Sequence, residues 1–225
     1  SESSRYALAG VLLEFAEDRI TAVGTDGRRL AKMEGLATSI GDHGKEGGTT
    51  IVPARAFQLM DRGLSDGEGD LQITTRVNDI VVRKNGVTFF SRLLEGKFPR
   101  WRDVFPHRNQ ASRIPLAVGP FYTALRQAAI VSSDESRGID FTFGEGTLSM
   151  TGSTAEVGQS HVELPIEYTG PKITVALDNR YVSDVLKVLD ADRTVTVELQ
   201  SSEGAVLFLT EDGYAYVVMP LSKDR

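Results

Sequence analysis

Few residues in this sequence have the types and spacing that catalysis requires. The chain has no cysteine, which excludes disulfides, thiolate zinc sites and a cysteine nucleophile. Its three histidines, His43, His107 and His161, fall in predicted loops or near predicted strand starts. They show no metal-ligand spacing, so we interpret them as surface residues. No GxSxG motif or Ser-His-Asp ordering appears. The sequence therefore predicts no metal site and no cofactor.

Asp26-Gly27-Arg28-Arg29 is the most conspicuous charged motif. By itself it is typical of a solvated turn, but a carboxylate at Asp26 leaves open a hydrolytic enzyme in a repeat-built, β-rich fold. Carboxylates are plentiful and nothing singles out an acid pair. The glycine-rich segment Gly41–Gly48 does not open a helix, as a phosphate-binding loop must, so we interpret it as a turn between strands.

The composition is that of a soluble globular protein. The 225 residues are 40% hydrophobic and 25% charged, enough for one or two domains with an apolar core. No stretch approaches the roughly 20 apolar residues of a membrane helix, and no signal-peptide pattern follows the start. The absence of cysteine fits a cytoplasmic protein. The net charge of −6 disfavours tight phosphate binding, so any DNA function requires a local basic face or enclosure of the DNA.

Strand patterns dominate the elements that must position these residues. Alternating, β-branched-rich segments predict strands at Val11–Phe15, Ile20–Val23, Thr50–Val52, Leu71–Thr75, Ile80–Lys84, Val87–Arg92, Ile139–Phe143, Thr147–Thr151, Ile173–Leu177, Val195–Leu199, Ala205–Leu209 and Tyr214–Met219. Helical spacing of apolar residues predicts helices at Pro53–Leu64, Phe121–Val131 and Arg180–Leu189. Asp178 or Asn179 is a suitable N-cap for the third helix.

These elements form two similar copies. The first hairpin of each copy ends at Thr25 and at Ser153, an offset of 128 residues, and Phe90 and Val217 give a late offset of 127. The second copy opens with a helix that the first lacks, so we expect a helix upstream of Ser1 in a longer protein. Glu95–Ile114 is the natural linker. We therefore predict two domains, at residues 1–98 and 99–225.

Four segments resemble the bacterial DNA sliding clamp family, the DNA polymerase III beta subunits. Thr25–Ala31 (TDGRRLA) resembles the family's TDGHRLA signature, and Leu94–Pro99 (LEGKFP) resembles its interdomain LIDGKFP stretch. Ala129–Ile139 resembles its AAILSxExxRGV run, and Tyr216–Pro220 (YVVMP) resembles its C-terminal YVVMPM. The four occur in the family's order over nearly the whole chain. The resemblance implies an α+β DNA clamp fold, with two repeated domains of antiparallel sheets whose helices pack on one side.

The resemblance implies a non-catalytic processivity factor. Such a protein encircles duplex DNA without reading its sequence, and it tethers the DNA polymerase III alpha subunit, the clamp loader and repair polymerases through short peptide motifs. Tethering works by raising the effective concentration of the polymerase. The full-length protein is expected to form a homodimeric ring, and the present chain is expected to be a monomer that does not close one.

The resemblance also implies three sets of site residues. Those of a peptide-binding groove are Leu8, Thr25, Gly27, Arg28, Arg29, Leu30, Pro99, Val104, Val217, Val218, Met219, Pro220 and Leu221. Those expected to face DNA are Arg5, Tyr6, Arg55, Arg62, Arg126, Arg180 and Lys187. Those of the dimer interface are Ile130 and Val131.

Two departures from the family pattern affect the groove. Arg28 stands where the family usually has histidine, and the chain ends Leu221-Ser222-Lys223-Asp224-Arg225 instead of Met-Arg-Leu. Asp103 stands where some relatives have arginine, so we leave it out of the groove. An apolar terminus at Val217–Pro220 suits a peptide groove and has no use in a hydrolase, which favours the clamp.

Overall fold

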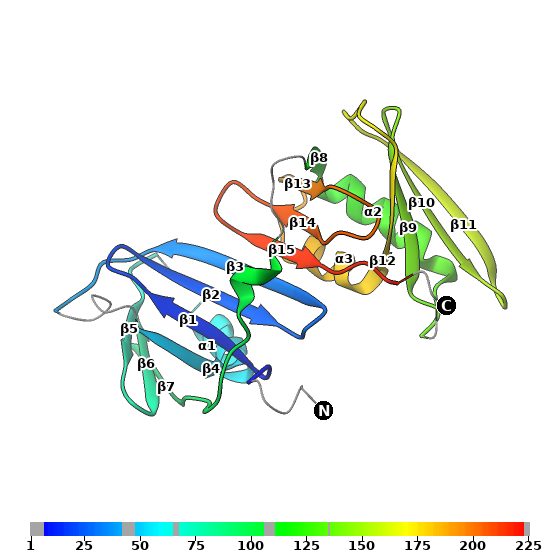
Figure 1. Cartoon of the computed structure of the whole chain (residues 1–225). Helices are drawn as coiled ribbons and strands as arrows, with labels where there is room; N and C mark the ends of the chain where they lie inside the picture. The colour runs from blue at the N-terminus through cyan, green and yellow to red at the C-terminus, as the bar shows by residue number, and fades with distance from the viewer. Residues whose placement is uncertain (1–6, 42–47, 65–67, 106–110, 135, 223–225) are drawn as a thin grey trace. The chain divides into compact units, whose positions relative to one another are not determined.

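The protein consists of two compact units, which together carry 15 strands among the described residues. The computed structural model describes residues 7–41, 48–64, 68–105, 111–134 and 136–222 (Figure 1). The first unit is Ser1–Trp101 and the second is Arg102–Arg225. A short 3-10 helix, Trp101–Val104, contains the boundary. Among the described residues, no helix has the length and apolar composition needed to cross a membrane.

The first unit contains two antiparallel sheets and one helix, α1 (Ala54–Leu64). Four strands, β1 (Gly10–Phe15), β2 (Arg19–Thr25), β3 (Arg29–Leu36) and β4 (Thr49–Pro53), lie in the order β4-β1-β2-β3. The strands β5 (Gln72–Thr75), β6 (Asp79–Lys84) and β7 (Val87–Arg92) form the other sheet. The core lies where α1 packs on both sheets, and its buried side chains are Leu13, Phe15, Val52, Met60, Ile80 and Val82. Burial of these apolar surfaces holds the sheets and the helix together.

The second unit is larger and has two long helices, α2 (Val118–Ala128) and α3 (Asn179–Lys187), which contact each other (Figure 1). One sheet has the order β11-β10-β9-β12, with β9 at Gly138–Gly144, β10 at Thr147–Thr154, β11 at Gly158–Pro165 and β12 at Ile173–Asp178. The other has the order β15-β14-β13-β8, with β8 at Ser112–Ala117, β13 at Thr194–Leu199, β14 at Val206–Leu209 and β15 at Ala215–Val218. A 3-10 turn, Ala129–Val131, follows α2.

The two units repeat one topology, which confirms the predicted repeat. The pairing β4-β1-β2-β3 corresponds to β12-β9-β10-β11, and β5-β6-β7 corresponds to β13-β14-β15. The register is also repeated, because Leu13 pairs with Ala22 in the first unit and Phe141 pairs with Met150 in the second, both 128 residues later. The helix α1 follows β4, and α3 follows β12, which is the counterpart of β4.

The strand–helix segment β8–α2 has no counterpart among the described residues of the first unit. In the second unit β8 pairs with β13, and α2 covers β10 and β11. The expectation that the first copy lacks its opening helix is therefore confirmed for the described part of the chain.

Several predicted element boundaries were wrong. Pro53 ends β4 and is not in the helix, because it pairs with Gly10 of β1. The second helix begins at Val118, three residues earlier than predicted, and its α-helical part ends at Ala128. The third helix ends at Lys187 instead of Leu189. The strands β3, β8 and β11 were not predicted, and β8 occupies the end of the expected linker.

Candidate functional site

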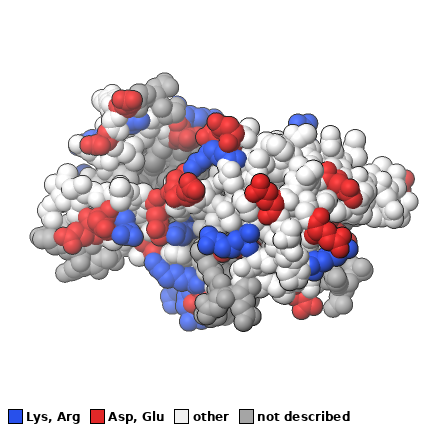
Figure 2. All heavy atoms as spheres, turned by 90° about the horizontal axis from the view of Figure 1, so that it is seen from above, with Lys and Arg blue, Asp and Glu red and all other residues white. Residues whose placement is uncertain are grey.

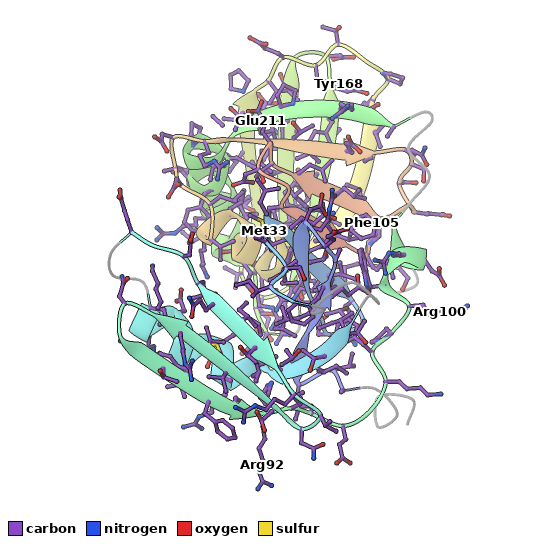
Figure 3. All side chains as sticks on the ribbon, turned by 90° about the vertical axis from the view of Figure 1, so that its left-hand side faces the viewer. Met33, Arg92, Arg100, Phe105, Tyr168 and Glu211 are labelled. Carbon is purple, nitrogen blue, oxygen red and sulfur yellow. The ribbon has the colours of Figure 1, made fainter. Side chains whose placement is uncertain are left out.

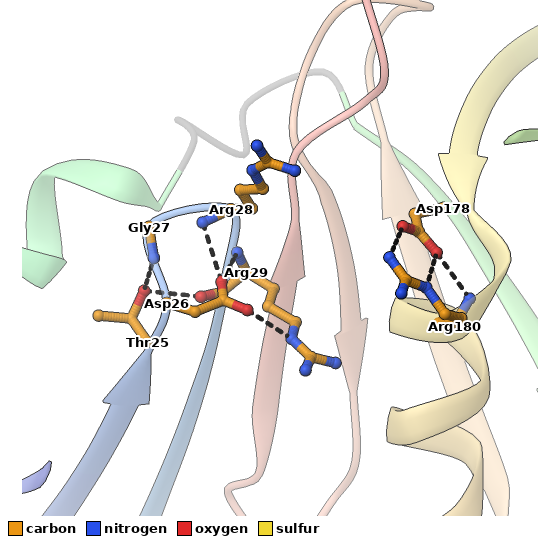
Figure 4. Close-up of polar contacts among 7 residues, drawn as sticks. All are labelled: Thr25, Asp26, Gly27, Arg28, Arg29, Asp178 and Arg180. Carbon is orange, nitrogen blue, oxygen red and sulfur yellow. Dashed lines mark hydrogen bonds and ion pairs between the residues drawn. The ribbon is translucent and has the colours of Figure 1, made fainter. Parts of the chain in front are cut away.

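The turn between β2 and β3 is held by hydrogen bonds within five residues, Thr25–Arg29 (Figure 4). The Thr25 hydroxyl donates to the Arg29 carbonyl at 2.6 Å and accepts from the Gly27 amide at 3.1 Å. The Asp26 carboxylate accepts from the amides of Arg28 and Arg29 at 3.0 and 3.1 Å. Gly27 has φ of 87°, a conformation that favours glycine. The sequence TDGRR therefore specifies a rigid turn.

The Asp26 carboxylate accepts three hydrogen bonds from the turn itself. One oxygen accepts the two backbone amides and the other accepts from Arg29 Nε at 3.0 Å. A general acid or base must instead have an oxygen directed at a substrate. The hydrolytic alternative at Asp26 is therefore unsupported, and the described residues also contain no cluster of three or more potential metal ligands.

The other groove candidates of the first unit differ in exposure. Leu30 is 2% exposed and belongs to the core. Leu8 and Pro99 are half-buried, while Gly27 and Arg28 are exposed. Leu30 is therefore part of the apolar core next to the turn. The exposed residues Gly27 and Arg28 are the ones that a ligand could contact.

The C-terminal segment of the second unit changes from buried to exposed at Met219. Val217 and Val218 are 0% exposed, because they are in β15, whereas Met219 is 44% exposed. Leu221 is 38% exposed and its amide donates to the Ala176 carbonyl of β12 at 2.8 Å. Met219 and Leu221 are thus two apolar side chains presented to solvent by a segment fixed at both ends. Val104, in the 3-10 helix, is also 38% exposed.

Five of the six cationic side chains expected to face DNA are described, and all five are exposed on helices but differ in their local partners. Arg55 and Arg62 lie on α1. Arg126 of α2 lies 6.0 Å from the Tyr122 ring centroid, and Lys187 is 3.8 Å from the Asp184 carboxylate. Acidic and basic side chains are interspersed over the face shown in Figure 2.

Arg180 is bound to Asp178 through its guanidinium (Figure 4). Arg180 Nε and Nη2 donate to the two carboxylate oxygens at 3.1 and 2.7 Å, and the Arg180 amide donates at 2.9 Å. Asp178, one of the two residues predicted for this position, is thus the N-cap of α3. Burial raises the pKa of the Asp178 carboxyl, but the Arg180 hydrogen bonds and charge outweigh it, so the net pKa is lowered. Because this ion pair balances the charge of Arg180, Arg180 attracts phosphate less strongly than the predicted role implied.

Two of the predicted DNA-facing residues and two of the histidines interpreted as surface residues cannot be placed. Arg5, Tyr6, His43 and His107 lie outside the described residues. Ile130 is 79% exposed, whereas Val131 is 7% exposed and packs in the second unit's core.

His161 is exposed, as predicted, but it lies within β11 and not in a loop. Its Nδ1 is 3.2 Å from the Thr151 hydroxyl and its Nε2 is 3.2 Å from Glu163. These contacts of His161 could not be predicted from the sequence, because β11 was not recognised as a strand and its pairing with β10 was therefore unknown.

In the comparison with known proteins, each unit matches a domain model of the same family. The family model of the DNA polymerase III beta subunit, central domain, matches residues 1–100, and that of the C-terminal domain matches residues 102–222. The Pseudomonas putida beta sliding clamp is 31% identical over 96% of this chain and 58% of its own length. The Escherichia coli beta sliding clamp is 29% identical with the same coverage.

Solved structures show the same fold. A Pseudomonas aeruginosa DNA polymerase sliding clamp with ligand has a TM-score of 0.89 and 28% identity, over 99% of this chain and 60% of that one. The P. aeruginosa clamp bound to griselimycin has a TM-score of 0.87 and 29% identity, over 97% and 58%. The chain thus spans about 58% of the length of these two curated relatives. By both domain models, the chain belongs to the DNA polymerase III beta subunit family and comprises its central and C-terminal domains.

Proposed function

We propose that this chain is part of a processivity clamp: a cytoplasmic, non-catalytic protein that encircles duplex DNA and tethers polymerases by short peptide motifs. The observation that carries the proposal is the match of two consecutive clamp-domain models over nearly the whole chain. The proposed partners are duplex DNA, the polymerase III alpha subunit, the clamp loader, repair polymerases and a second protomer of the full-length protein.

The proposed DNA-facing side chains are exposed cations on helices. Arg55, Arg62 and Arg126 are the stronger candidates, because Arg180 is bound to Asp178. Contacts to phosphate carry no base sequence information, which suits a protein that slides. Enclosure removes the need for tight binding and is compatible with the net charge of −6.

The proposed peptide-contacting residues are the Thr25–Arg29 turn and the exposed apolar side chains Met219 and Leu221. A short peptide buries little surface, so affinity is expected to be on the order of micromolar, about −8 kcal/mol. A flexible methionine side chain can adapt to different ligands. A few such contacts should carry most of the binding free energy.

Met219→Ala tests the proposal. Because Met219 is 44% exposed, the change should leave the melting temperature nearly unaltered and weaken binding of a clamp-binding peptide by about 1–2 kcal/mol. Fluorescence anisotropy with a labelled peptide measures the binding. Val157→Ala, which changes another exposed apolar residue of the same unit, should leave peptide binding intact.

Two results would contradict the proposal. One is a Met219→Ala protein that melts early but binds peptide normally, since the side chain would then be structural. The other is wild-type protein that binds no clamp-binding peptide at up to about a millimolar, or about −4 kcal/mol.

A further inference from the structure

The three-stranded sheet of the first unit has a buried face and an outward face. Its buried face carries Ile73, Ile80, Val82 and Phe89, which belong to the unit's core or pack against it. The helix α1 packs on this face, because a Cβ at Gly63 would lie 2.5 Å from the Phe89 ring. Side chains alternate between the two faces along a strand. The alternation places on the outward face Thr74, Asp79, Val81, Arg83, Phe90 and Arg92.

Phe90 is a large apolar side chain on this outward face. It is 62% exposed, whereas its neighbour Phe89 packs against the core. In the pairing of β7 with β6 it lies directly opposite Val81. An aromatic ring that is exposed to this extent on a strand can stack on a planar group of a ligand.

Two exposed arginines lie on either side of Phe90 along the strand direction. Arg92 is two residues further along β7, about 7 Å from Phe90 by the rise of a strand. Arg83 of β6 pairs with Thr88, so it is diagonal to Phe90, at about 7–8 Å. Neither guanidinium has an ion-pair or hydrogen-bond partner among the described residues. Figure 3 shows the Arg92 side chain extending away from the sheet.

This face is positively charged, although the chain as a whole has a net charge of −6. The one acidic residue in β5, β6 and β7 is Asp79, and it lies 3.7 Å from Arg76. That pair is close to neutral, so Arg83 and Arg92 give the face a local positive charge. Because salt screens exposed charges beyond about 10 Å, these arginines select a ligand whose anionic groups touch them.

We propose that this outward face of β5–β7 binds single-stranded nucleic acid, with one base stacked on Phe90 and the phosphates on either side of it paired to Arg83 and Arg92. Exposed aromatic rings on a sheet surface stack unpaired bases, and neighbouring cations bind the backbone. An acidic peptide would also pair with the arginines. The apolar anchors of a peptide, however, fill concave pockets, whereas Phe90 projects from the strand.

The site is separate from the cations proposed to face duplex DNA. Arg55 and Arg62 are on α1, which packs on the opposite face of this sheet. Duplex DNA keeps its bases stacked on one another, so it offers no free base to Phe90. The proposal therefore stands or fails independently of the clamp function.

Phe90 variants test the stacking. Anisotropy of fluorescein-labelled hexathymidylate at low salt measures its binding to the 225-residue chain. Phe90→Ala should weaken binding by about fivefold or more, the effect of losing one base–aromatic stack. Phe90→Trp should retain binding because it keeps a ring, and Phe90→Leu should lose it because leucine is apolar without a ring.

Arginine variants test the phosphate contacts. Each phosphate that a single strand pairs with a cation contributes about 0.7 to the slope of the logarithm of affinity against the logarithm of salt concentration. Arg83→Ala and Arg92→Ala should therefore each reduce the steepness of this slope by about 0.7.

Two variants serve as matched controls. Val87→Ala changes another exposed apolar residue of β7, 42% exposed, on the same face of the strand as Phe89. Lys97→Ala removes one exposed positive charge outside the sheet. Both should bind hexathymidylate as the wild type does, with an unchanged salt dependence. Thermal melts of all variants show whether they are folded.

Crosslinking locates the site in the unaltered protein, so the result does not depend on a variant folding. Hexathymidylate with one 5-iodouracil should crosslink to Phe90 on irradiation, as mass spectrometry of the digested protein shows. Crosslinks confined to the helices would overturn the proposal. So would a wild-type protein that does not bind hexathymidylate, or a folded Phe90→Ala protein that binds it normally. If labelled hexaglutamate binds through Phe90 and hexathymidylate does not, the face is a peptide site and the proposal is wrong.

Discussion

Two aspartates fix the β2–β3 turn and the start of α3 by the same chemistry. Asp26 accepts the amides of the β2–β3 turn, and Asp178 accepts the Arg180 amide at the start of α3. Each carboxylate also binds an arginine close in sequence. At the residue scale, the charged side chains therefore serve local structure first, and Arg28 is the member of the turn that remains available to a ligand.

Asp178→Ala should destabilise the second unit by about 1–2 kcal/mol through loss of the helix cap. Urea unfolding measures the change. Asp184→Ala on the same helix should cost less than about 0.5 kcal/mol, because Asp184 is 45% exposed and 3.8 Å from Lys187. Equal effects of the two changes would mean that the cap contributes little.

The Asp178 carboxylate also makes stability depend on pH. Because its pKa is lowered in the folded protein, its contribution is fully present above the unfolded pKa, about 4, and is lost as the pH falls through the lowered folded value. Asp178→Asn keeps a capping side chain without the titrating group. The difference in stability between wild type and Asp178→Asn should therefore shrink below about pH 4.

At the scale of elements, the sequence predicted those helices and strands whose apolar residues form a regular buried face. The helices and most hairpin strands were recognised, because their apolar residues repeat at helical or alternating spacing. The missed strands carry that signal weakly. In β3 charged residues and Gly35 interrupt the apolar ones, β8 contains Pro115, and in β11 the alternation is limited to Val162 and Leu164 before its final proline. Of the candidate site, the turn could be predicted from its motif. The burial of Leu30, Val217 and Val218 could not, because it depends on tertiary packing.

One pair of equivalent glycines differs between the two copies in the space available for a side chain. Gly24 and Gly152 are equivalent, 128 residues apart. A Cβ at Gly152 would lie 3.0 Å from the Ala128 carbonyl oxygen and 3.1 Å from Val131, whereas at Gly24 nothing lies within 4 Å. Gly152→Ala should therefore destabilise the protein by on the order of 1–3 kcal/mol, and Gly24→Ala should change stability by less than about 0.5 kcal/mol. Chemical denaturation of both variants gives the comparison, and a larger loss for Gly24→Ala would contradict it.

At the scale of the whole molecule, each unit has its own sheets, with one α-helix described in the first unit and two in the second. The unit boundary at Trp101 and Arg102 agrees closely with the limits of the two family models, at residues 100 and 102. The predicted boundary after residue 98 is close to these. The two units repeat one topology, and in the first unit the apolar core lies between the helix and both sheets.

Residues 102–225, expressed alone, should fold. This unit contains both of its sheets and both helices, with buried Phe121, Phe141 and Phe208. Circular dichroism and a single cooperative urea transition would show it. A product that aggregates, or that lacks a cooperative transition, would mean that the unit depends on the first one.

The pairing of β8 with β13 has a consequence during protein synthesis. Leu116 pairs with Val195, 79 residues later (195 − 116), whereas the four-stranded sheet of the first unit closes by Gly10 and Pro53. At roughly 5–20 residues per second, a ribosome takes about 4–16 seconds to deliver the partner of β8. During that interval Ile114 and Leu116, both buried in the finished fold, emerge from the ribosome on an unpaired strand. The nascent second unit is thus most vulnerable to aggregation at its own beginning, and a chaperone that protects this chain should act on the segment around β8.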